Sequence, residues 1–416
     1  MKMVSTITLG LALALSGVST VAVQPALAAK KEKEPKVDLT PGVRNAVAEA
    51  QKAMGPDPKA PQDLATATAK AAEARAAATT PDDKFYSGSV SYDVGRASND
   101  TKLQGEALDL MLESGKVPQT SLGNFWLVRG RLAYDQKDYA KAEQAFGQAI
   151  QNGESSPDAF ALLVETKDKL GKPAEALAAL EQAISGAEAS GKPLPEAYYQ
   201  RGIAIGYKAK LPDQVERISQ AWVKAYPSPD NWRDTLITYR DLHKIDADFE
   251  LDLMRLMRTA KALKGESDYY TYAEQVYLKF PGEGKSVIDE GVAAGFLQLT
   301  PNSNIKNFSD TANSRVKADQ ADLASAASAA AKAANGVAAR ATADSYLGYG
   351  DFAKAAELYK LALQKGGVDA NVVNTRLGMA LARAGQKEEA KQVFSSITGP
   401  RQALAKYWTI WIDQQA

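Results

Sequence analysis

The sequence predicts an all-α protein in which helical hairpins stack into a right-handed superhelix, an α-solenoid. Three observations support this fold class. Apolar residues recur at the spacing of amphipathic helices on both sides of a polar turn within residues 123–156. The second half of this pattern returns 34 residues later and appears twice more near the C-terminus. Helix-opening signals of the type Ser-Pro-Asp stand where predicted hairpins begin.

Residues 123–156 contain the clearest hairpin. An Ala or Gly at the closest approach lets two paired helices touch, while an aromatic side chain fills the groove between them. The polar turn DQKD separates the two predicted helices. Their apolar faces consist of Trp126, Gly130 and Tyr134 in the first helix and Ala142, Phe146 and Ala149 in the second.

The face of the second helix recurs along the chain. The corresponding positions are Ala176, Leu180 and Ala183, then Ala355, Tyr359 and Ala362, and then Ala390, Phe394 and Ile397. This pattern resembles the tetratricopeptide repeat family, and the resemblance is specific at about 123–190 and 339–399 and degenerate elsewhere. It implies helical-hairpin repeats that expose a curved binding surface.

Capping signals agree with this register. Ser156-Pro157 and Ser228-Pro229 each place a capping Ser before a helix-opening Pro, and Thr80-Pro81 offers the same signal earlier in the chain. The first two signals lie 72 residues apart, which is close to two repeat periods. We therefore expect helices to begin at these prolines.

The predicted organisation follows from these signals. We divide the chain into a signal peptide (1–28), a polar linker (29–40), degenerate helical hairpins (41–122), tetratricopeptide-like repeats (123–229), irregular helical hairpins (230–335), further tetratricopeptide-like repeats (336–399) and a capping helix (400–416). The alanine-rich stretches 62–78 and 317–340 are strong helix formers with little large apolar surface. They are interpreted either as long packing helices or as partly mobile ones.

The N-terminus has the layout of a secretory signal peptide. Lys2 precedes an apolar run from Ile7 to Leu15, and small residues end in Ala26-Leu27-Ala28, which predicts cleavage after Ala28 or Ala29. A membrane anchor is the alternative, but the apolar run is short, and no later stretch reaches membrane-spanning length. The resemblance and the export signal together indicate an exported bacterial member of the family. We expect a periplasmic protein, with secretion as the alternative.

Composition excludes several classes of function. Lys plus Arg and Asp plus Glu both number 50, so no net charge favours nucleic acid or acidic membranes as a partner. The chain has no Cys and a single His, which leaves no thiolate metal site and at most one imidazole for catalysis. That residue, His243, lies in the polar stretch DLHKIDAD and is interpreted as a solvated or capping side chain. We predict no enzyme activity, no metal and no cofactor.

The stretch GEGKS at 282–286 looks like a phosphate-binding loop but does not meet its requirements. Such a loop needs an earlier glycine, at the position that Lys279 occupies, and a preceding buried strand. The preceding segment DYYTYAEQVYLKF reads as a helix instead. We align GKSVI with AKQVF at 390–394, so that Gly284 takes the place of the small residue and Ile288 that of the groove-filling one.

The resemblance also implies which residues line the curved surface, because tetratricopeptide repeats use fixed positions of each first helix. Carried onto this sequence, those positions give a mixed aromatic and basic stripe suited to an extended peptide or an acidic terminus. The alternative is a set of solvated repeat faces. The predicted partner-binding residues are Asn124, Arg131, Tyr134, Gln200, Tyr207, Lys208, Arg233 and Arg240.

Three functional hypotheses follow. The first is a non-catalytic exported scaffold that binds a protein or peptide on its concave face during envelope assembly or secretion. The alternative is a protein that binds or processes cell-wall or exported polysaccharide, although Trp126 and Trp222 fall at packing positions. The third is self-association through the C-terminal helix, which is more apolar than a polar cap requires because it contains Tyr407, Trp408, Ile410 and Trp411.

Overall fold

The protein is all-helical. The computed structural model describes residues 37–56 and 62–415, and these residues form α-helices and one short 3-10 helix but no strand. The predicted fold class is confirmed. The predicted signal peptide at 1–28 and residues 29–36 of the predicted linker lie outside the described residues. No helix in the described ranges is both long and apolar enough to cross a membrane.

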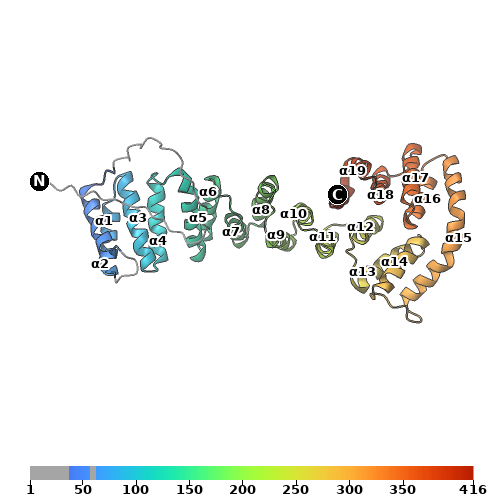
Figure 1. The fold of residues 1–416 in the computed structure, drawn as a ribbon, viewed down its shortest axis with the longest axis horizontal. Helices are drawn as coiled ribbons and strands as arrows, with labels where there is room; N and C mark the ends of the chain where they lie inside the picture. Colours follow the sequence, from blue (N-terminus) through green and yellow to red (C-terminus); the bar gives the residue numbers. More distant parts are fainter. Residues whose placement is uncertain (1–36, 57–61, 416) are drawn as a thin grey trace, which may run out of the picture.

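The first ten helices pair as successive hairpins, and each hairpin packs on the next (Figure 1). The pairs are α1 (Pro41–Met54) with α2 (Leu64–Ala77), α3 (Pro81–Ala97) with α4 (Thr101–Glu113), α5 (Gln119–Asp135) with α6 (Tyr139–Gln151), α7 (Pro157–Lys169) with α8 (Pro173–Ala189), and α9 (Glu196–Ala209) with α10 (Pro212–Ala225). In the middle of the molecule, α7 and α9 lie along one edge and α8 and α10 along the other (Figure 1).

The remaining helices curl into a ring-shaped lobe (Figure 1), called here the C-terminal lobe (residues 229–415). It consists of α11 (Pro229–Leu242), α12 (Ala247–Thr259), α13 (Gly265–Val276), α14 (Pro281–Ala293), α15 (Asn304–Lys332), α16 (Val337–Gly348), α17 (Phe352–Lys365), α18 (Ala370–Arg383), α19 (Lys387–Ser395), the 3-10 helix η1 (Gly399–Arg401) and α20 (Gln402–Asp413). Helix α20 packs on α10, α18 and α19, so the chain closes on its own middle.

Close packing of small residues against bulky ones holds the hairpins together, as the sequence predicts. A Cβ atom added to Gly130 would lie 2.5 Å from the ring of Phe146, and one added to Gly378 would lie 2.5 Å from the ring of Phe394. Both rings are buried. Since neither ring could stay in place beside an added methyl group, glycine is required for the helices to approach this closely.

The predicted capping residues are confirmed. Ser156 is the N-cap of α7 and Ser228 that of α11, and each hydroxyl accepts a hydrogen bond from a backbone N–H in the first turn of its helix. Thr80 caps α3, where its hydroxyl and the Asp83 carboxylate form a capping box. His243 is the C-cap of α11, and its Nδ1 lies 2.9 Å from the carbonyl oxygen of Tyr239. Its interpretation as a capping residue is confirmed.

Two predicted boundaries differ from the structure. The boundary between residues 122 and 123 falls inside α5, which begins at Gln119. The boundary at 335 falls between α15 and α16, but it does not separate two cores. A single apolar cluster runs from Val223 in α10 to Ile412 in α20 and contains residues from both sides of that boundary. The irregular hairpins and the C-terminal repeats therefore share one apolar core.

The alanine-rich stretches are packing helices for part of their length. Ala67, Ala71 and Ala74 of α2 are fully buried. The stretch 317–340 covers the end of the 29-residue helix α15, the break at 333–336 and the start of α16. Most of the α15 side chains in this stretch are exposed or half-buried, and Ala330 is buried.

The GEGKS stretch lies on the first turns of α14, directly after helix α13 rather than a strand. A Cβ atom added to Gly284 would come within 2.6 Å of the Tyr277 Cα atom, and Ile288 is fully buried. The interpretation of this stretch as the opening of a repeat helix is confirmed.

The apolar face of the C-terminal helix is used within the molecule. Tyr407 and Trp408 are buried, and the ring of Tyr407 packs edge-on against Trp232 of α11. Gln414 extends this contact, because its side chain accepts a hydrogen bond from the Trp232 indole and donates one to the carbonyl oxygen of Val223. Tyr407 and Trp408 are therefore not free to hold a second chain, whereas Ile410 and Trp411 are half-buried.

Candidate functional site

Four of the predicted partner-binding residues lie exposed on α5 and α9. They are Arg131, Gln200, Tyr207 and Lys208. The Tyr207 side chain is 47% exposed, which is uncommon for a large aromatic residue. Neither Arg131 nor Lys208 takes part in an ion pair among the described residues. These side chains are available for a ligand.

The first helices of neighbouring repeats meet on this surface. Tyr134 of α5 is half-buried and lies near Glu165 of α7. Burial is the largest cause that raises the pKa of Tyr134 to about 12, and the carboxylate of Glu165 is the second. Arg201 of α9 pairs with Asp168 of α7 at 3.5 Å. We call the exposed side of α5, α7 and α9 the repeat surface. Asn124, which is also half-buried, belongs to the same helix as Tyr134.

The two predicted residues of α11 are engaged by the protein itself. The guanidinium of Arg233 donates to both oxygens of Asp268, at 2.8 and 3.2 Å. Arg240 is half-buried, and its Nε lies 3.7 Å from the carboxylate of Asp241. Arg233 is therefore committed to Asp268 of α13, whereas among the described residues Arg240 has only this long contact with its neighbour in the sequence.

The two tryptophans predicted at packing positions, Trp126 and Trp222, differ in how deeply they are buried. Trp222 is 4% exposed and its indole donates to Glu196 at 3.0 Å, as expected of a core residue. Trp126 is half-buried and lines an open pocket of about 340 Å³ together with Asp109 and Arg129. Its assignment to the core is therefore only partly correct.

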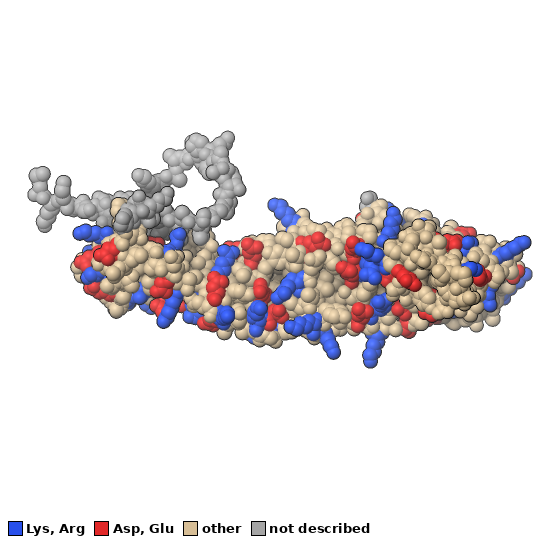
Figure 2. Space-filling model, turned by 90° about the horizontal axis from the view of Figure 1, so that it is seen from below, with Lys and Arg blue, Asp and Glu red and all other residues tan. Residues whose placement is uncertain are grey.

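Charges of both signs are mixed over the molecular surface. Figure 2 shows basic and acidic side chains side by side along the whole of the face it presents. No field of one sign would therefore draw a nucleic acid to this face.

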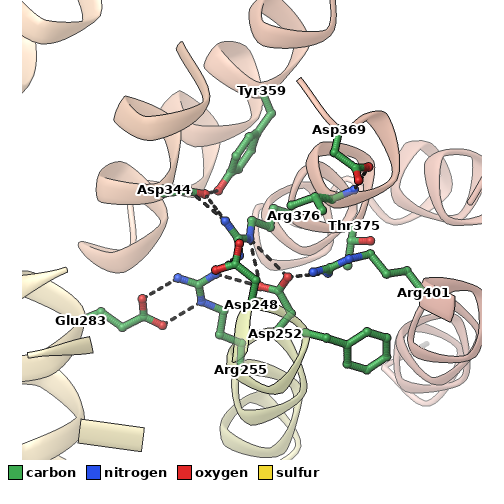
Figure 3. A network of polar contacts seen from close by, with 12 residues as sticks. Asp248, Asp252, Arg255, Glu283, Asp344, Tyr359, Asp369, Thr375, Arg376 and Arg401 are labelled. Carbon is green, nitrogen blue, oxygen red and sulfur yellow. Dashed lines mark hydrogen bonds and ion pairs between the residues drawn. The ribbon is translucent and has the colours of Figure 1, made fainter. Parts of the chain in front are cut away.

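The strongest polar feature of the C-terminal lobe is a buried network, which we call the charge hub (Figure 3). Its members are Asp252 and Arg255 of α12, Glu283 of α14, Asp344 of α16, Arg376 of α18 and Arg401 of η1. These six members comprise three carboxylates and three guanidinium groups, and each is at most 6% exposed. The more exposed carboxylate of Asp248 adds a contact of 3.6 Å to Arg376 at the edge of the network.

Asp252 lies at the centre of the charge hub. Its carboxylate accepts hydrogen bonds from Arg255 at 2.9 Å, from Arg376 at 3.1 Å and from Arg401 at 2.6 Å. Arg376 also reaches Asp344 at 3.0 Å. Arg255 donates hydrogen bonds to both carboxylate oxygens of Glu283, at 2.9 and 2.7 Å, and so extends the network to α14.

Two tyrosines complete the charge hub. The hydroxyl of Tyr272 donates to Glu283 at 2.7 Å, and that of Tyr359 donates to Asp344 at 2.6 Å. Burial alone would raise the pKa of Asp252, but Arg376, Arg255 and Arg401 outweigh it and hold this pKa below its ordinary value. The network fixes α12, α14, α16, α18 and η1 to one another.

Sequence reasoning missed the charge hub because its members lie far apart. Arg376 and Arg401 follow Asp252 by 124 and 149 residues. The one local signal is the helix segment FELDLMRLM, in which Asp252 and Arg255 stand among apolar residues on every side. Charged residues in such surroundings are buried and paired.

Comparisons with known proteins show only distant similarity. No protein-family model matches the chain, and no curated protein matches it. Among solved structures, Naa15/Naa10 bound to HypK-THB is matched at 14% identity over 85% of this chain and 63% of that chain, with a TM-score of 0.31. The chain thus spans less than two thirds of that protein's length.

Two further matches cover most of the matched chains. A tetratricopeptide repeat protein from Parabacteroides merdae is matched at 12% identity over 70% of this chain and 98% of that chain, with a TM-score of 0.26. Yeast Tom70 is matched at 11% identity over 89% of this chain and 96% of that chain, with a TM-score of 0.21. TM-scores this low carry no argument, and the helical-repeat architecture rests on the packing of the chain itself.

Proposed function

We propose that this chain is a non-catalytic, exported helical-repeat scaffold that holds an extended protein or peptide segment on its repeat surface during envelope assembly or secretion. The observation that carries the proposal is the exposed group of Arg131, Gln200, Tyr207 and Lys208 on α5 and α9, the first helices of two hairpins that flank the hairpin of α7 and α8. Helical hairpins that stack in this way leave such a surface to a partner.

The composition of the repeat surface suggests the kind of segment it holds. An exposed tyrosine offers apolar contact area and a hydroxyl at a small loss of conformational entropy. Arg131 and Lys208 can pair with carboxylates of the partner, while Glu165 and Asp168 disfavour a uniformly acidic one. The expected partner segment is extended, carries some acidic residues and contains apolar side chains.

Co-purification from the native compartment tests the proposal. Full-length protein carrying Arg131→Glu and Tyr207→Ala should lose its partner. The control variant carries Lys192→Glu and Gln182→Ala, which change exposed residues outside the repeat surface. It should retain the partner. If the first variant keeps every partner that the natural chain holds, the repeat surface is not the binding site.

A further inference from the structure

The C-terminal lobe contains a second candidate site, an open cavity of about 510 Å³. Its lining comes from α12, α13, α14, α16, α17, α18 and α20 and the turns beside them, all within the C-terminal lobe. Arg255 and Glu283 of the charge hub belong to its wall. The cavity has the size of a small-molecule pocket.

The charged residues of this cavity are not balanced. Four cations, Arg255, Arg258, Lys261 and Arg383, line it together with two carboxylates, those of Glu283 and Glu290. Arg255 pairs with Glu283 at 2.7 Å, and Arg258 pairs with Glu290 at 2.8 Å. Among the described residues, Lys261 and Arg383 have no carboxylate partner within ion-pair distance. Two positive charges therefore face the cavity without compensation.

A hydroxyl group and an aromatic ring, rather than a carboxylate, hold the Arg383 side chain in place. Its Nη1 donates to the hydroxyl of Thr259 at 3.0 Å, and its guanidinium lies 4.5 Å from the centre of the Phe352 ring. The cavity walls partly exclude water from the Arg383 guanidinium, and this desolvation and the nearby Arg258 lower the pKa of Arg383, because both disfavour its positive charge. An anion bound in the cavity would offset both effects, because its negative charge favours the charged form of Arg383.

The remaining wall is largely aromatic and apolar. Phe352, Tyr349 and Trp411 line the cavity with Leu347 and Met379. Arg258 is already committed to Glu290 and to the Ser286 hydroxyl, which it reaches at 2.6 Å. A ligand that fits these walls carries its negative charge at one end and an apolar group at the other.

We propose that this cavity binds a carboxylate carried on an apolar or aromatic body, with Arg383 as its principal ligand and Lys261 as a second cation. The aromatic and apolar wall argues against inorganic phosphate, which has no apolar body to cover Phe352 and Trp411. The proposal goes beyond the scaffold function, since the cavity lies in the C-terminal lobe and not on the repeat surface.

Isothermal titration calorimetry of the full chain tests the proposal with benzoate as the probe. Benzoate should bind at least ten-fold more tightly than benzamide, which has the same shape without the charge, and more tightly than inorganic phosphate. Equal binding of benzamide, stronger binding of phosphate or no binding of benzoate at millimolar concentration would overturn the proposal.

Variants locate the binding within the cavity. Arg383→Gln should weaken benzoate binding at least ten-fold. The matched control is Arg44→Gln at the other end of the molecule, because Arg44 is likewise exposed and donates to a neutral oxygen, the Leu39 carbonyl. This control should bind benzoate unchanged. Equal weakening in both variants would contradict the assignment.

Glu290→Gln separates binding from a folding defect, because it should increase affinity. Removal of this carboxylate frees Arg258 for the ligand and removes a repulsive charge, so benzoate should bind about three-fold more tightly. A misfolded variant could not gain affinity. Weaker binding by Glu290→Gln would contradict the electrostatic account.

A peptide probe distinguishes the two sources of such a carboxylate. Acetyl-Gly-Phe with a free C-terminus should depend on Arg383 as benzoate does. If it binds at least ten-fold more tightly than benzoate, the natural ligand is a peptide C-terminus, and otherwise it is a small organic acid. Peptide binding that is insensitive to Arg383→Gln would overturn the site.

Discussion

At the scale of single residues, we expect substitution of Asp252 to destabilise the protein most. Removing one member of a buried ion network leaves its partners charged, buried and unpaired, at a cost of about 3–5 kcal/mol. We expect Asp252→Asn to lower the free energy of unfolding by roughly this amount in urea denaturation.

An exposed ion pair provides the control for that measurement. Asp289 pairs with Lys285 on the surface of α14, and its side chain is 56% exposed. Asp289→Asn should change the free energy of unfolding by less than about 0.5 kcal/mol. If Asp252→Asn were equally mild, the charge hub would not hold the C-terminal lobe together.

The charge hub also predicts how stability depends on pH. Arginine neighbours hold the pKa of Asp252 below 3.8 and that of Glu283 below 4.5, despite the opposing effect of burial. The folded state therefore binds fewer protons than the unfolded state in acid. The stabilisation is complete above about pH 4.5 and is lost as the pH falls through the lowered pKa values.

Thermal unfolding between about pH 7 and pH 3 tests this dependence. The natural chain should lose melting temperature steeply below about pH 4.5. Asp252→Asn should show a shallower decline, since one of the two titrating groups is gone. Parallel curves for the two proteins would show that the acid sensitivity arises elsewhere.

Single residues also show where sequence reasoning succeeds and where it stops. Ser156 and Ser228 could be recognised as caps because a cap is defined by its immediate neighbours. The position of Arg233 within a repeat predicts a place on the binding surface, but nothing local in the sequence predicts its ion pair with Asp268 of another hairpin. Contacts between distant segments leave no periodic trace in the sequence.

At the scale of elements, the effect of a Gly→Ala replacement on stability can be compared between glycines at helix crossings and helical glycines with open space around them. Gly130→Ala and Gly378→Ala would force a methyl group to 2.5 Å from a buried ring. Overpacking of this kind costs about 1–3 kcal/mol. We expect both variants to be destabilised by that amount in chemical denaturation.

Replacement by alanine should raise the free energy of unfolding, rather than lower it, at two other helical glycines. Gly147 of α6 and Gly186 of α8 have no atom within 4 Å of an added Cβ. Their replacement by Ala should stabilise the protein by about 0.5–1 kcal/mol through helix propensity. Stabilisation at all four positions would show that the helices do not approach closely.

The elements of the repeats were predictable because their signals are local. The spacing of Ala142, Phe146 and Ala149 identifies a packing face within one helix, and the structure buries all three. The closure of the lobe was not predictable, because α20 meets α10 and α11 through contacts such as that of Gln414 with Trp232, 182 residues away. The sequence shows only that this helix is unusually apolar.

At the scale of the whole molecule, the proposed export has a direct consequence. The predicted signal peptide should be removed, so the protein recovered from its native compartment should begin at Ala29 or Lys30. N-terminal sequencing or mass spectrometry of the intact protein measures this. Retention of residues 1–28 in the mature protein would contradict export by cleavage and with it the periplasmic location.

The architecture divides the molecule's possible roles between two regions. Hairpins α1 to α10 stack in a row and expose the repeat surface, whereas the C-terminal lobe closes on itself around the charge hub (Figure 1). A scaffold of this kind can hold a partner along the row while the lobe stays rigid. The central claim is that the partner contacts the first helices of the row.

Photo-crosslinking in living cells tests that claim most directly. A photoreactive amino acid is placed at Arg131 or Tyr207 on the repeat surface, or at the exposed residues Gln182 and Ser185 of α8 as controls. The account predicts the same crosslinked partner from positions 131 and 207 and none from positions 182 and 185. Crosslinks at 182 and 185 without crosslinks at 131 and 207 would contradict it.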